Sequence, residues 1–384
     1  MLKFIGKRLI QGLLLLVVFL ALVYLLLEAQ PGDITQQLIS DPDIPPEAQR
    51  MLAAQLGLDQ PLAGRVVTYV INFFQGDLGV SFTQYPTPVS QLILERLPRT
   101  VVLFLSATLV AYYLGFGLGK IMAWRRGRFT ETALTLGGVA GYTVFYPWFA
   151  IMMLWFFGFI LDWFPLGKFT DVAEWTGAPM NPNQVFMRFM ISAFAVSALV
   201  LAVFVVARNL KAERSQRIVW RTGYSVLLVS FVAYWWFSPL RPYVGDLLHH
   251  TLLPVMTLAC VAFAGVMLLT RSAMLETLRE DYILTARAKG LSERTIRDKH
   301  AARNALLPVI TAMVLALAFV ISGGIITEGV FSWPGLGQML LTATLLEDIP
   351  LATGTLGIIG ILALVGHIVA DVAYMYLDPR IRYS

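Results

Sequence analysis

Charged residues and cysteine are both scarce in this sequence of 384 residues, and each scarcity excludes a class of protein. Asp, Glu, Lys and Arg make up 14% of the chain, against about 25% in an average soluble domain. One soluble core cannot hide the apolar surface of a chain that is 57% hydrophobic, so the composition indicates a lipid-facing surface. The single cysteine, Cys260, lies inside an apolar run, which excludes a disulfide framework and a cysteine-based zinc site.

Other absences concern chemistry. The chain has no Walker A glycine loop, so it cannot hydrolyse ATP by that route. Its apolar segments are almost free of ionisable residues, which disfavours an ion-coupled secondary transporter. A membrane-embedded enzyme would need paired catalytic groups or metal ligands, and His367 alone is not such a set. A passive channel is the third rival, and co-purification of an ATPase would separate an importer from all three.

Eight apolar segments are long enough to cross roughly 30 Å of hydrocarbon as helices, which takes about 20 residues each. They are Leu9–Leu27, Thr100–Ala123, Thr132–Leu161, Phe189–Ala207, Thr222–Leu240, Thr251–Thr270, Asn304–Thr327 and Ile349–Ala370. The short alternating segments of a membrane barrel are missing, so the sequence predicts an all-α membrane protein with about eight transmembrane helices. The third segment is too long for one straight crossing, and its glycines and Pro147 predict a tilt, a kink or a re-entrant portion.

The first apolar segment is interpreted as a retained span. Its run is longer than a signal-peptide core of about 7–15 residues, and Glu28-Ala29-Gln30-Pro31 is a poor cleavage site. The predicted organisation is an N-terminal transmembrane helix (1–28), an extracytoplasmic segment (29–99) and a membrane core (100–384). Within the core we expect a helical hairpin at about 186–241 and a cytoplasmic loop at 273–303.

Basic residues gather on one side of this arrangement. Most of the 29 Lys and Arg residues lie before the first span, after the second, between the fourth and fifth, between the sixth and seventh, and after the last. Eight crossings put all of these positions on one face, which the positive-inside rule makes cytoplasmic. The sequence therefore predicts a multi-pass protein with both termini in the cytoplasm.

The extracytoplasmic segment 29–99 is too large for a simple connection. Pro45-Pro46-Glu47 is typical of a helix start, and apolar residues recur at helical spacing from Leu62 to Phe74. An amphipathic helix lying on the membrane or on a partner fits this pattern. A small packed subdomain fits it equally well.

The loop 273–303 has the pattern of two helices with a break between them. The first helix is expected to end near Lys289, with Gly290 in the left-handed conformation that glycine adopts readily after a helix. Ser292 can then cap a second helix. Ala286, Ala288 and Gly290 are small enough to let another protein approach, although a solvated basic loop is the alternative interpretation.

The stretch from Asp281 to Ser292 resembles the cytoplasmic loop of ABC importer permeases, in the form found in oligopeptide and dipeptide systems. Further motifs occur in the order of that family over most of the chain. They are Ala29–Asp33, Leu56–Leu62, Gly76–Ser81, Glu95–Thr100, His250–Pro254, Glu328–Gly337 and Asp378–Arg382. The resemblance implies a type I ABC importer permease-like helical bundle in the bacterial inner membrane.

Several roles follow from this resemblance alone. The loop would be the coupling helix that docks on an ATPase subunit, through Asp281, Tyr282, Thr285, Ala286, Arg287, Ala288, Lys289, Gly290, Leu291 and Ser292. The late motif would shape the extracytoplasmic mouth of the pore, through Glu328, Gly329, Phe331, Trp333, Pro334, Gly335 and Gly337. The implied partners are a second homologous permease, two ABC ATPase subunits, an extracytoplasmic binding protein and membrane lipid, with no nucleic acid. The chain would not be an enzyme and would bind no cofactor, since ATP and Mg²⁺ belong to the ATPases.

The sequence departs from the family pattern at two places. Leu284 stands where the wider permease family has a glutamate, which is also the case in the peptide-type subset. Such permeases usually have six spans, so the predicted hairpin at about 186–241 would be an insertion into a six-helix core.

Peptides are the cargo that the resemblance favours, with nickel and oligosaccharides as alternatives. His249-His250 invites a metal interpretation. Adjacent histidines point about 100° apart on a helix, no acid or cysteine constellation supports them, and the pair is expected at an interfacial helix start. No metal site is therefore predicted.

Overall fold

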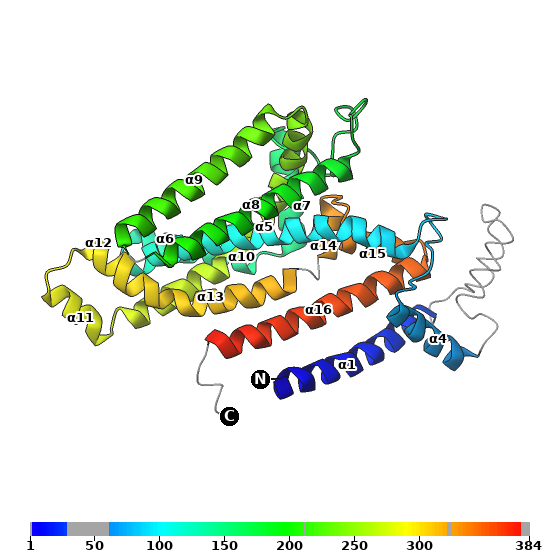
Figure 1. The fold of residues 1–384 in the computed structure, drawn as a ribbon, viewed down its shortest axis with the longest axis horizontal. Helices are drawn as coiled ribbons and strands as arrows, with labels where there is room; N and C mark the ends of the chain where they lie inside the picture. The colour runs from blue at the N-terminus through cyan, green and yellow to red at the C-terminus, as the bar shows by residue number, and fades with distance from the viewer. Residues whose placement is uncertain (1, 29–60, 211, 321–323, 378–384) are drawn as a thin grey trace. The chain divides into compact units, whose positions relative to one another are not determined.

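The computed structural model describes residues 2–28, 61–210, 212–320 and 324–377, and these residues fold into helices (Figure 1). The described residues contain no strand, and their only extended pairing is an isolated bridge between Val80 and Pro88. The predicted motifs Ala29–Asp33 and Asp378–Arg382, the helix start at Pro45 and most of the Leu56–Leu62 motif lie outside the described residues.

Among the described residues, seven helical segments are long and apolar enough to cross a membrane. They are Arg8–Leu26 in α1 (Leu2–Glu28), α5 (Val89–Trp124), α8 (Pro182–Arg208), Arg214–Phe237 in α9 (Glu213–Phe237), α10 (Arg241–Thr277), Glu293–Ala318 from α12 (Glu293–Thr295) through η2 (Ile296–Ala301) into α13 (Ala302–Phe319), and Ile349–Val372 in α16 (Ile349–Leu377). A bent helix pair brings the number to eight. The all-α membrane architecture with about eight spans is confirmed.

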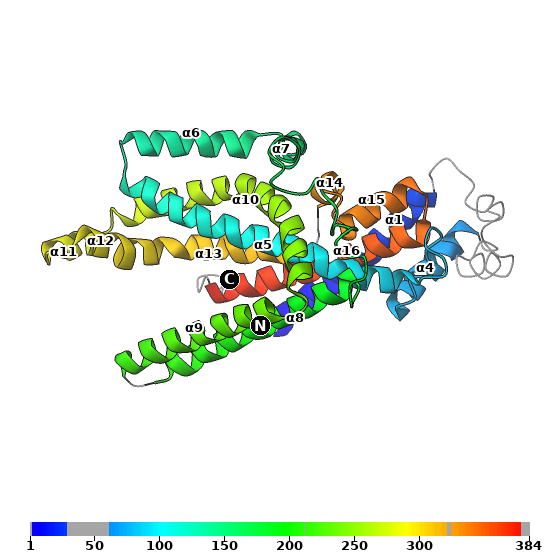
Figure 2. The ribbon, with the colours of Figure 1, turned by 90° about the horizontal axis from the view of Figure 1, so that it is seen from above.

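The bent pair is the third predicted segment. It consists of α6 (Phe129–Thr143), followed by α7 (Tyr146–Met153) and the π-helical η1 (Leu154–Ile160), with a bend of 104° between the two parts (Figure 2). The break falls just before Pro147, at the start of α7, because a proline cannot continue the hydrogen bonds of the preceding helix. The sequence predicted a tilt, a kink or a re-entrant portion here, and the bend fits a broken span or a re-entrant loop.

The helices form two compact units. The first contains residues Met1–Phe156 and Pro254–Ser384, and the second contains Phe157–Leu253. In the first unit α16 is the central helix, since α1, α13 and α15 (Leu336–Leu345) all pack on it. Close contact is possible because glycines face these neighbours: a Cβ at Gly366 would lie 2.1 Å from the carbonyl oxygen of Ala318 on α13.

Helix α4 (Leu62–Gln75) is the amphipathic helix expected in the 29–99 segment. Tyr69 and Phe73 pack with Leu16 and Leu20 of α1, and the Tyr69 hydroxyl donates a hydrogen bond of 3.1 Å to the carbonyl oxygen of Thr353 on α16. The opposite face of α4 leaves large apolar side chains exposed. One face of α4 is thus packed on α1 and α16 of the same unit, and the other face is exposed.

Two helices begin earlier than the sequence indicated. Helix α5 begins at Val89 instead of Thr100, so the Glu95–Thr100 motif is helical and contains Pro98 within the helix. Helix α10 begins at Arg241, so His249 and His250 lie two turns inside it. The expectation that this histidine pair marks a helix start is wrong.

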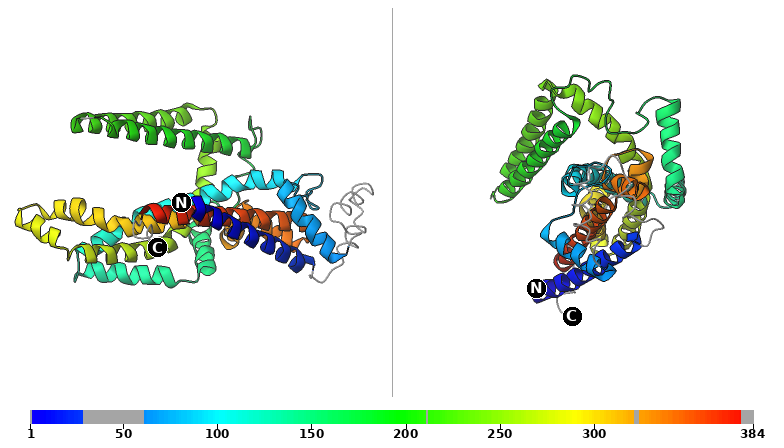
Figure 3. Two further views of the ribbon diagram at one scale, coloured as in Figure 1. Left: turned by 60° about the horizontal axis from the view of Figure 1, so that its bottom comes forward. Right: turned by 90° about the vertical axis from the view of Figure 1, so that its right-hand side faces the viewer.

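The second unit contains α8 and α9, which pack against each other as an antiparallel hairpin in the interval expected for one (Figure 3). Aromatic side chains hold the two helices together: the Phe189 ring lies 5.8 Å from that of Phe231 and 5.4 Å from that of Trp235. Trp235 also donates a hydrogen bond of 3.0 Å to the hydroxyl of Ser192. None of the residues in the hydrophobic window of α8, and only 6% of those in the window of α9, are buried.

Gly366→Ala is expected to destabilise the protein, because the new methyl group meets the backbone of α13. Overpacking of this kind costs about 1–3 kcal/mol. Gly117→Ala is the matched control, since a Cβ at this helical position meets nothing within 4 Å. Thermal unfolding of the purified protein in mild detergent measures the difference, and equal melting temperatures of the two variants would contradict the close α13–α16 crossing.

Candidate functional site

The loop between α10 and α13 has the helix–break–helix form expected from the sequence. Helix α11 (Asp281–Ala288) ends in a turn in which the Gly290 amide donates to the Arg287 carbonyl oxygen at 2.9 Å. Gly290 has φ of +72°, the left-handed conformation that favours glycine. Ser292 then caps α12, because its hydroxyl accepts a hydrogen bond of 3.4 Å from the amide of Thr295.

One side of α11 is packed into its own chain. Ile283 is fully buried and Ala286 is 5% exposed, in a cluster with Met274 of α10, Ile296 of η2 and Ala305 of α13. The small Ala286 side chain therefore packs α11 against α10, η2 and α13 of the same chain, and it is not available to a partner. The other predicted coupling residues are exposed: Asp281, Tyr282, Thr285, Arg287, Ala288, Lys289, Gly290, Leu291 and Ser292.

Polar contacts join α11 to two helices that follow it, α12 and α13. The Asn304 amide donates to the Tyr282 hydroxyl at 2.6 Å, and Arg287 lies 3.7 Å from Glu293. Leu284, which replaces the family glutamate, is 58% exposed. The loop thus presents apolar and basic side chains outward on a base that is fixed to α10 and α13.

The Glu328–Gly337 motif is built around a buried carboxylate. Glu328 lies in the short α14 (Ile325–Val330), has no exposed surface, and accepts hydrogen bonds from the Thr100 hydroxyl at 2.8 Å and the Gln338 amide at 3.0 Å. The Gly337 amide adds a further hydrogen bond. Burial raises the pKa of the Glu328 carboxyl above its usual range, while these donors oppose the shift.

The same motif packs on α5 through its aromatic residues. Trp333 is fully buried and its indole N–H donates to the Arg99 carbonyl oxygen at 3.2 Å. The Leu336 amide donates to the Thr100 hydroxyl at 2.8 Å, so this one hydroxyl joins Glu328 to the start of α15. The motifs Glu95–Thr100 and Glu328–Gly337, predicted separately, therefore form one structure.

The glycines of this motif are required by close approach. A Cβ at Gly335 would lie 2.4 Å from both the Glu328 carboxylate and the Thr100 hydroxyl, and a Cβ at Gly337 would lie 2.8 Å from the Ile325 amide nitrogen. Phe331 is also buried, whereas Gly329 and Pro334 are half-buried. Most of the residues predicted for the mouth thus act by packing and do not line an open surface.

A second buried carboxylate, which sequence reasoning missed, lies at the start of α16. Asp348 is fully buried and accepts hydrogen bonds from the hydroxyls of Ser81 at 2.6 Å and Thr83 at 2.8 Å. Its other oxygen accepts from the Leu351 amide at 3.2 Å, as an N-cap residue does. An aspartate followed by Ile349-Pro350 is a helix-start signal, which could have drawn attention to it.

An apolar pocket of about 750 Å³ lies beside α14 in the first unit. Leu258 and Val261 of α10 and Ile325 and Ile326 of α14 contribute to its wall. Tyr146 of α7 reaches the same pocket and shares a hydrogen bond of 2.7 Å with the Thr327 hydroxyl.

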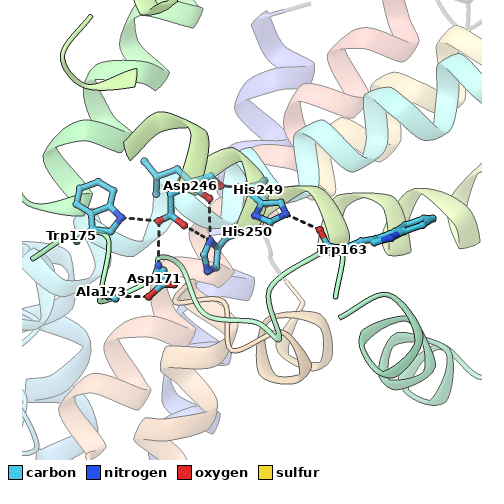
Figure 4. Close-up of polar contacts among 9 residues, drawn as sticks. Trp163, Asp171, Ala173, Trp175, Asp246, His249 and His250 are labelled. Atoms are coloured by element: carbon cyan, nitrogen blue, oxygen red, sulfur yellow. Dashed lines mark hydrogen bonds and ion pairs between the residues drawn. The ribbon is translucent and has the colours of Figure 1, made fainter. Parts of the chain in front are cut away.

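In the second unit Asp246 is the centre of the polar contacts around His250, while His249 has a separate partner (Figure 4). Its carboxylate lies 2.9 Å from His250 Nδ1 and accepts hydrogen bonds from the Trp175 indole at 2.7 Å and the Asp171 amide at 3.2 Å. His249 instead makes a hydrogen bond of 2.8 Å with the Trp163 carbonyl oxygen. Within the described residues no group of three or more His, Cys, Asp or Glu could hold a metal ion.

Thr100→Val is expected to lower the melting temperature of the protein. It removes the hydroxyl that satisfies both Glu328 and the Leu336 amide, and each buried polar group without its partner costs about 1–3 kcal/mol. Thr100→Ser keeps the hydroxyl and is the control. Thermal unfolding in mild detergent compares the two, and a valine variant as stable as the serine variant would show that this hydroxyl is dispensable.

Comparison with known proteins identifies the family. Residues 181–383 match the family of binding-protein-dependent transport system inner membrane components. Residues 1–104 match the family that describes the N-terminal part of such membrane components. The family has the type I ABC permease fold, as the sequence predicted.

Relatives that match the chain over its full length support the same family. The chain is 29% identical over 383 residues to an oligopeptide transport system permease protein of Bacillus subtilis, and 31% over 386 residues to a di/tripeptide transport system permease protein of Pseudomonas aeruginosa. It is 28% identical over 385 residues to a dipeptide transport system permease protein of Escherichia coli, and each comparison covers 100% of both chains. The chain therefore belongs to the family of binding-protein-dependent transport system inner membrane components.

Proposed function

We propose that this chain is the permease subunit of an ABC importer for peptides, and that it forms half of the translocation pore. The exposed α11 loop on its buried apolar base carries the proposal, because a docking element must be accessible to a partner and rigidly joined to the helices that it moves. The names of the full-length relatives support peptides as the cargo. As a transport component, the chain is not itself an enzyme.

Three kinds of protein complete the proposed importer. A second, homologous permease forms the other half of the pore, and an extracytoplasmic binding protein delivers the peptide. Two ABC ATPase subunits bind ATP and Mg²⁺, so this chain needs no cofactor of its own. Membership in a binding-protein-dependent family supports such partners.

The α11 end of the chain faces the cytoplasm in this proposal, with both termini on the same side. The support is the distribution of Lys and Arg, which gather at this end of the spans. The Glu328–Gly337 motif then lies toward the extracytoplasmic side, and the apolar pocket beside α14 is placed where it can form part of the pore wall.

Coupling proceeds by displacement of α11. When the ATPase subunits close on ATP, they move the outward-facing residues of α11, and the buried Ile283 and Ala286 carry this motion into α10 and α13. The nucleotide thereby shifts the population between outward- and inward-facing states of the pore.

Gly290→Asp is expected to abolish binding of the ATPase subunits or to uncouple their ATP hydrolysis from transport. The reason is that it strains the left-handed turn and adds a charged side chain to the docking surface. The measurement is ATPase activity and co-purification of the full transporter, expressed with its chromosomal neighbours and isolated in mild detergent. Because ATP is cytoplasmic, ATPase bound through α11 also supports the proposed sidedness.

Gly127→Asp is the matched control. Gly127 also has positive φ, at +79°, and a Cβ at either glycine meets nothing within 4 Å. The control is expected to keep its ATPase. If no ATPase associates with the wild-type chain, or if both variants lose it equally, the coupling role of α11 is refuted.

Peptide cargo is tested by uptake. A strain lacking this chain is expected to lose uptake of labelled di- to pentapeptides and to recover it when the gene is returned. Unchanged peptide uptake, with loss of nickel or oligosaccharide uptake instead, would refute the cargo and leave the importer itself standing.

A further inference from the structure

The second unit has a groove between the α8–α9 hairpin and the start of α10. Its volume is about 700 Å³, and Phe189, Phe231 and Trp235 contribute to its walls, with Trp236 and Arg241 beside them. Gly245 also lines the groove, and a Cβ at this position would meet nothing within 4 Å. The groove is therefore apolar along its walls and has one cationic side chain.

Arg241 is the charged group of the groove. Its guanidinium lies 3.6 Å from the centroid of the Trp236 ring, a cation–π contact that orients the side chain. The side chain is exposed within its unit and forms no ion pair with the described residues. Helix α10 begins at this residue, so the helix dipole adds positive potential at the same point.

The aromatic residues around Arg241 indicate its depth in the membrane. Tyr234, Trp235, Trp236 and Phe237 end α9 immediately before the turn to Arg241. Tyr and Trp are enriched where the hydrocarbon meets the headgroups. The planar guanidinium of arginine pairs well with phosphate oxygens, which the headgroups supply. The aromatic residues thus indicate headgroup depth for the cation of the groove, while the apolar walls suit hydrocarbon.

We propose that this groove binds one phospholipid molecule, whose phosphate pairs with Arg241 and whose acyl chain lies between the hairpin and α10. Charge complementarity favours this occupant over a transmembrane helix. An apolar helix would leave the guanidinium without a counter-charge. Helix interfaces in membranes use small residues, and Gly245 is the one small residue among those that line this groove. The bound lipid would fill the joint between the hairpin and α10.

The proposal is tested on the full transporter in mild detergent, by native mass spectrometry during titration with phosphatidylglycerol. Wild type is expected to retain one phospholipid at low lipid concentration. Arg241→Gln should weaken this binding roughly tenfold, as loss of one charge-assisted hydrogen bond predicts. Gly245→Leu, which fills the groove and leaves Arg241 in place, should also lose the lipid.

Two variants control for charge and for side-chain volume. Arg188→Gln removes an exposed arginine of α8 that does not line the groove, and Gly137→Leu adds volume on α6 where a Cβ meets nothing within 4 Å. Both are expected to bind lipid as wild type does. Binding by Arg241→Gln or Gly245→Leu that equals the controls would overturn the site.

A photoreactive amino acid at Val232, which lines the groove, identifies the occupant independently of those variants. In native membranes it should cross-link to phospholipid. A cross-link to a polypeptide, whether another protein or another part of this chain, would overturn the proposal. If Gly245→Leu fails to assemble, this cross-linking measurement still tests whether a phospholipid occupies the groove.

Discussion

The buried carboxylate of Glu328 imposes a strict condition on the first unit. A carboxylate without solvent must be met by hydrogen-bond donors, and here the donors come from α5 and from the start of α15. To satisfy the Glu328 carboxylate, the Thr100 hydroxyl must lie within hydrogen-bond distance of it, and this arrangement leaves no room for a Cβ at Gly335. The carboxylate therefore specifies the junction of three helices, which apolar packing alone would leave less defined.

The α11 end is held in a different way. Its contacts to the rest of the unit are mainly apolar, through Ile283 and Ala286, while the charged side chains point away from that base. Such apolar packing can transmit a displacement of α11 to the helices beneath it. It leaves the exposed side of α11 free to bind a partner. This division of one short helix into a buried and an exposed side is what the proposed coupling needs.

Features with a local cause could be predicted from the sequence, and features with a distant cause could not. Gly290 and Pro147 act on their own backbone, so the loop break and the bend in the third segment were expected and are found. The hydrogen bond from Thr100 to Glu328 joins residues 228 positions apart, and that from Ser81 to Asp348 joins residues 267 apart. A single sequence carries no signal for such pairings, and small size alone could not reveal that Ala286 packs inward.

The two ends of the first unit are connected by contiguous packing. Ile296 and Ala305 belong to the apolar base of α11, and α13 runs from this base along α16, with the Gly366–Ala318 approach fixing their crossing. Helix α16 in turn begins at the Asp348 junction and packs on α15, whose first residues bind Glu328 through their amides. Because Gly366 leaves α13 and α16 in backbone contact, neither helix can slide without repacking the other. The proposed displacement of α11 therefore has a physical route to the Glu328 junction through rigid helices. Under this proposal, the pore would change shape at the apolar pocket beside that junction, which Ile325, Ile326 and Tyr146 line.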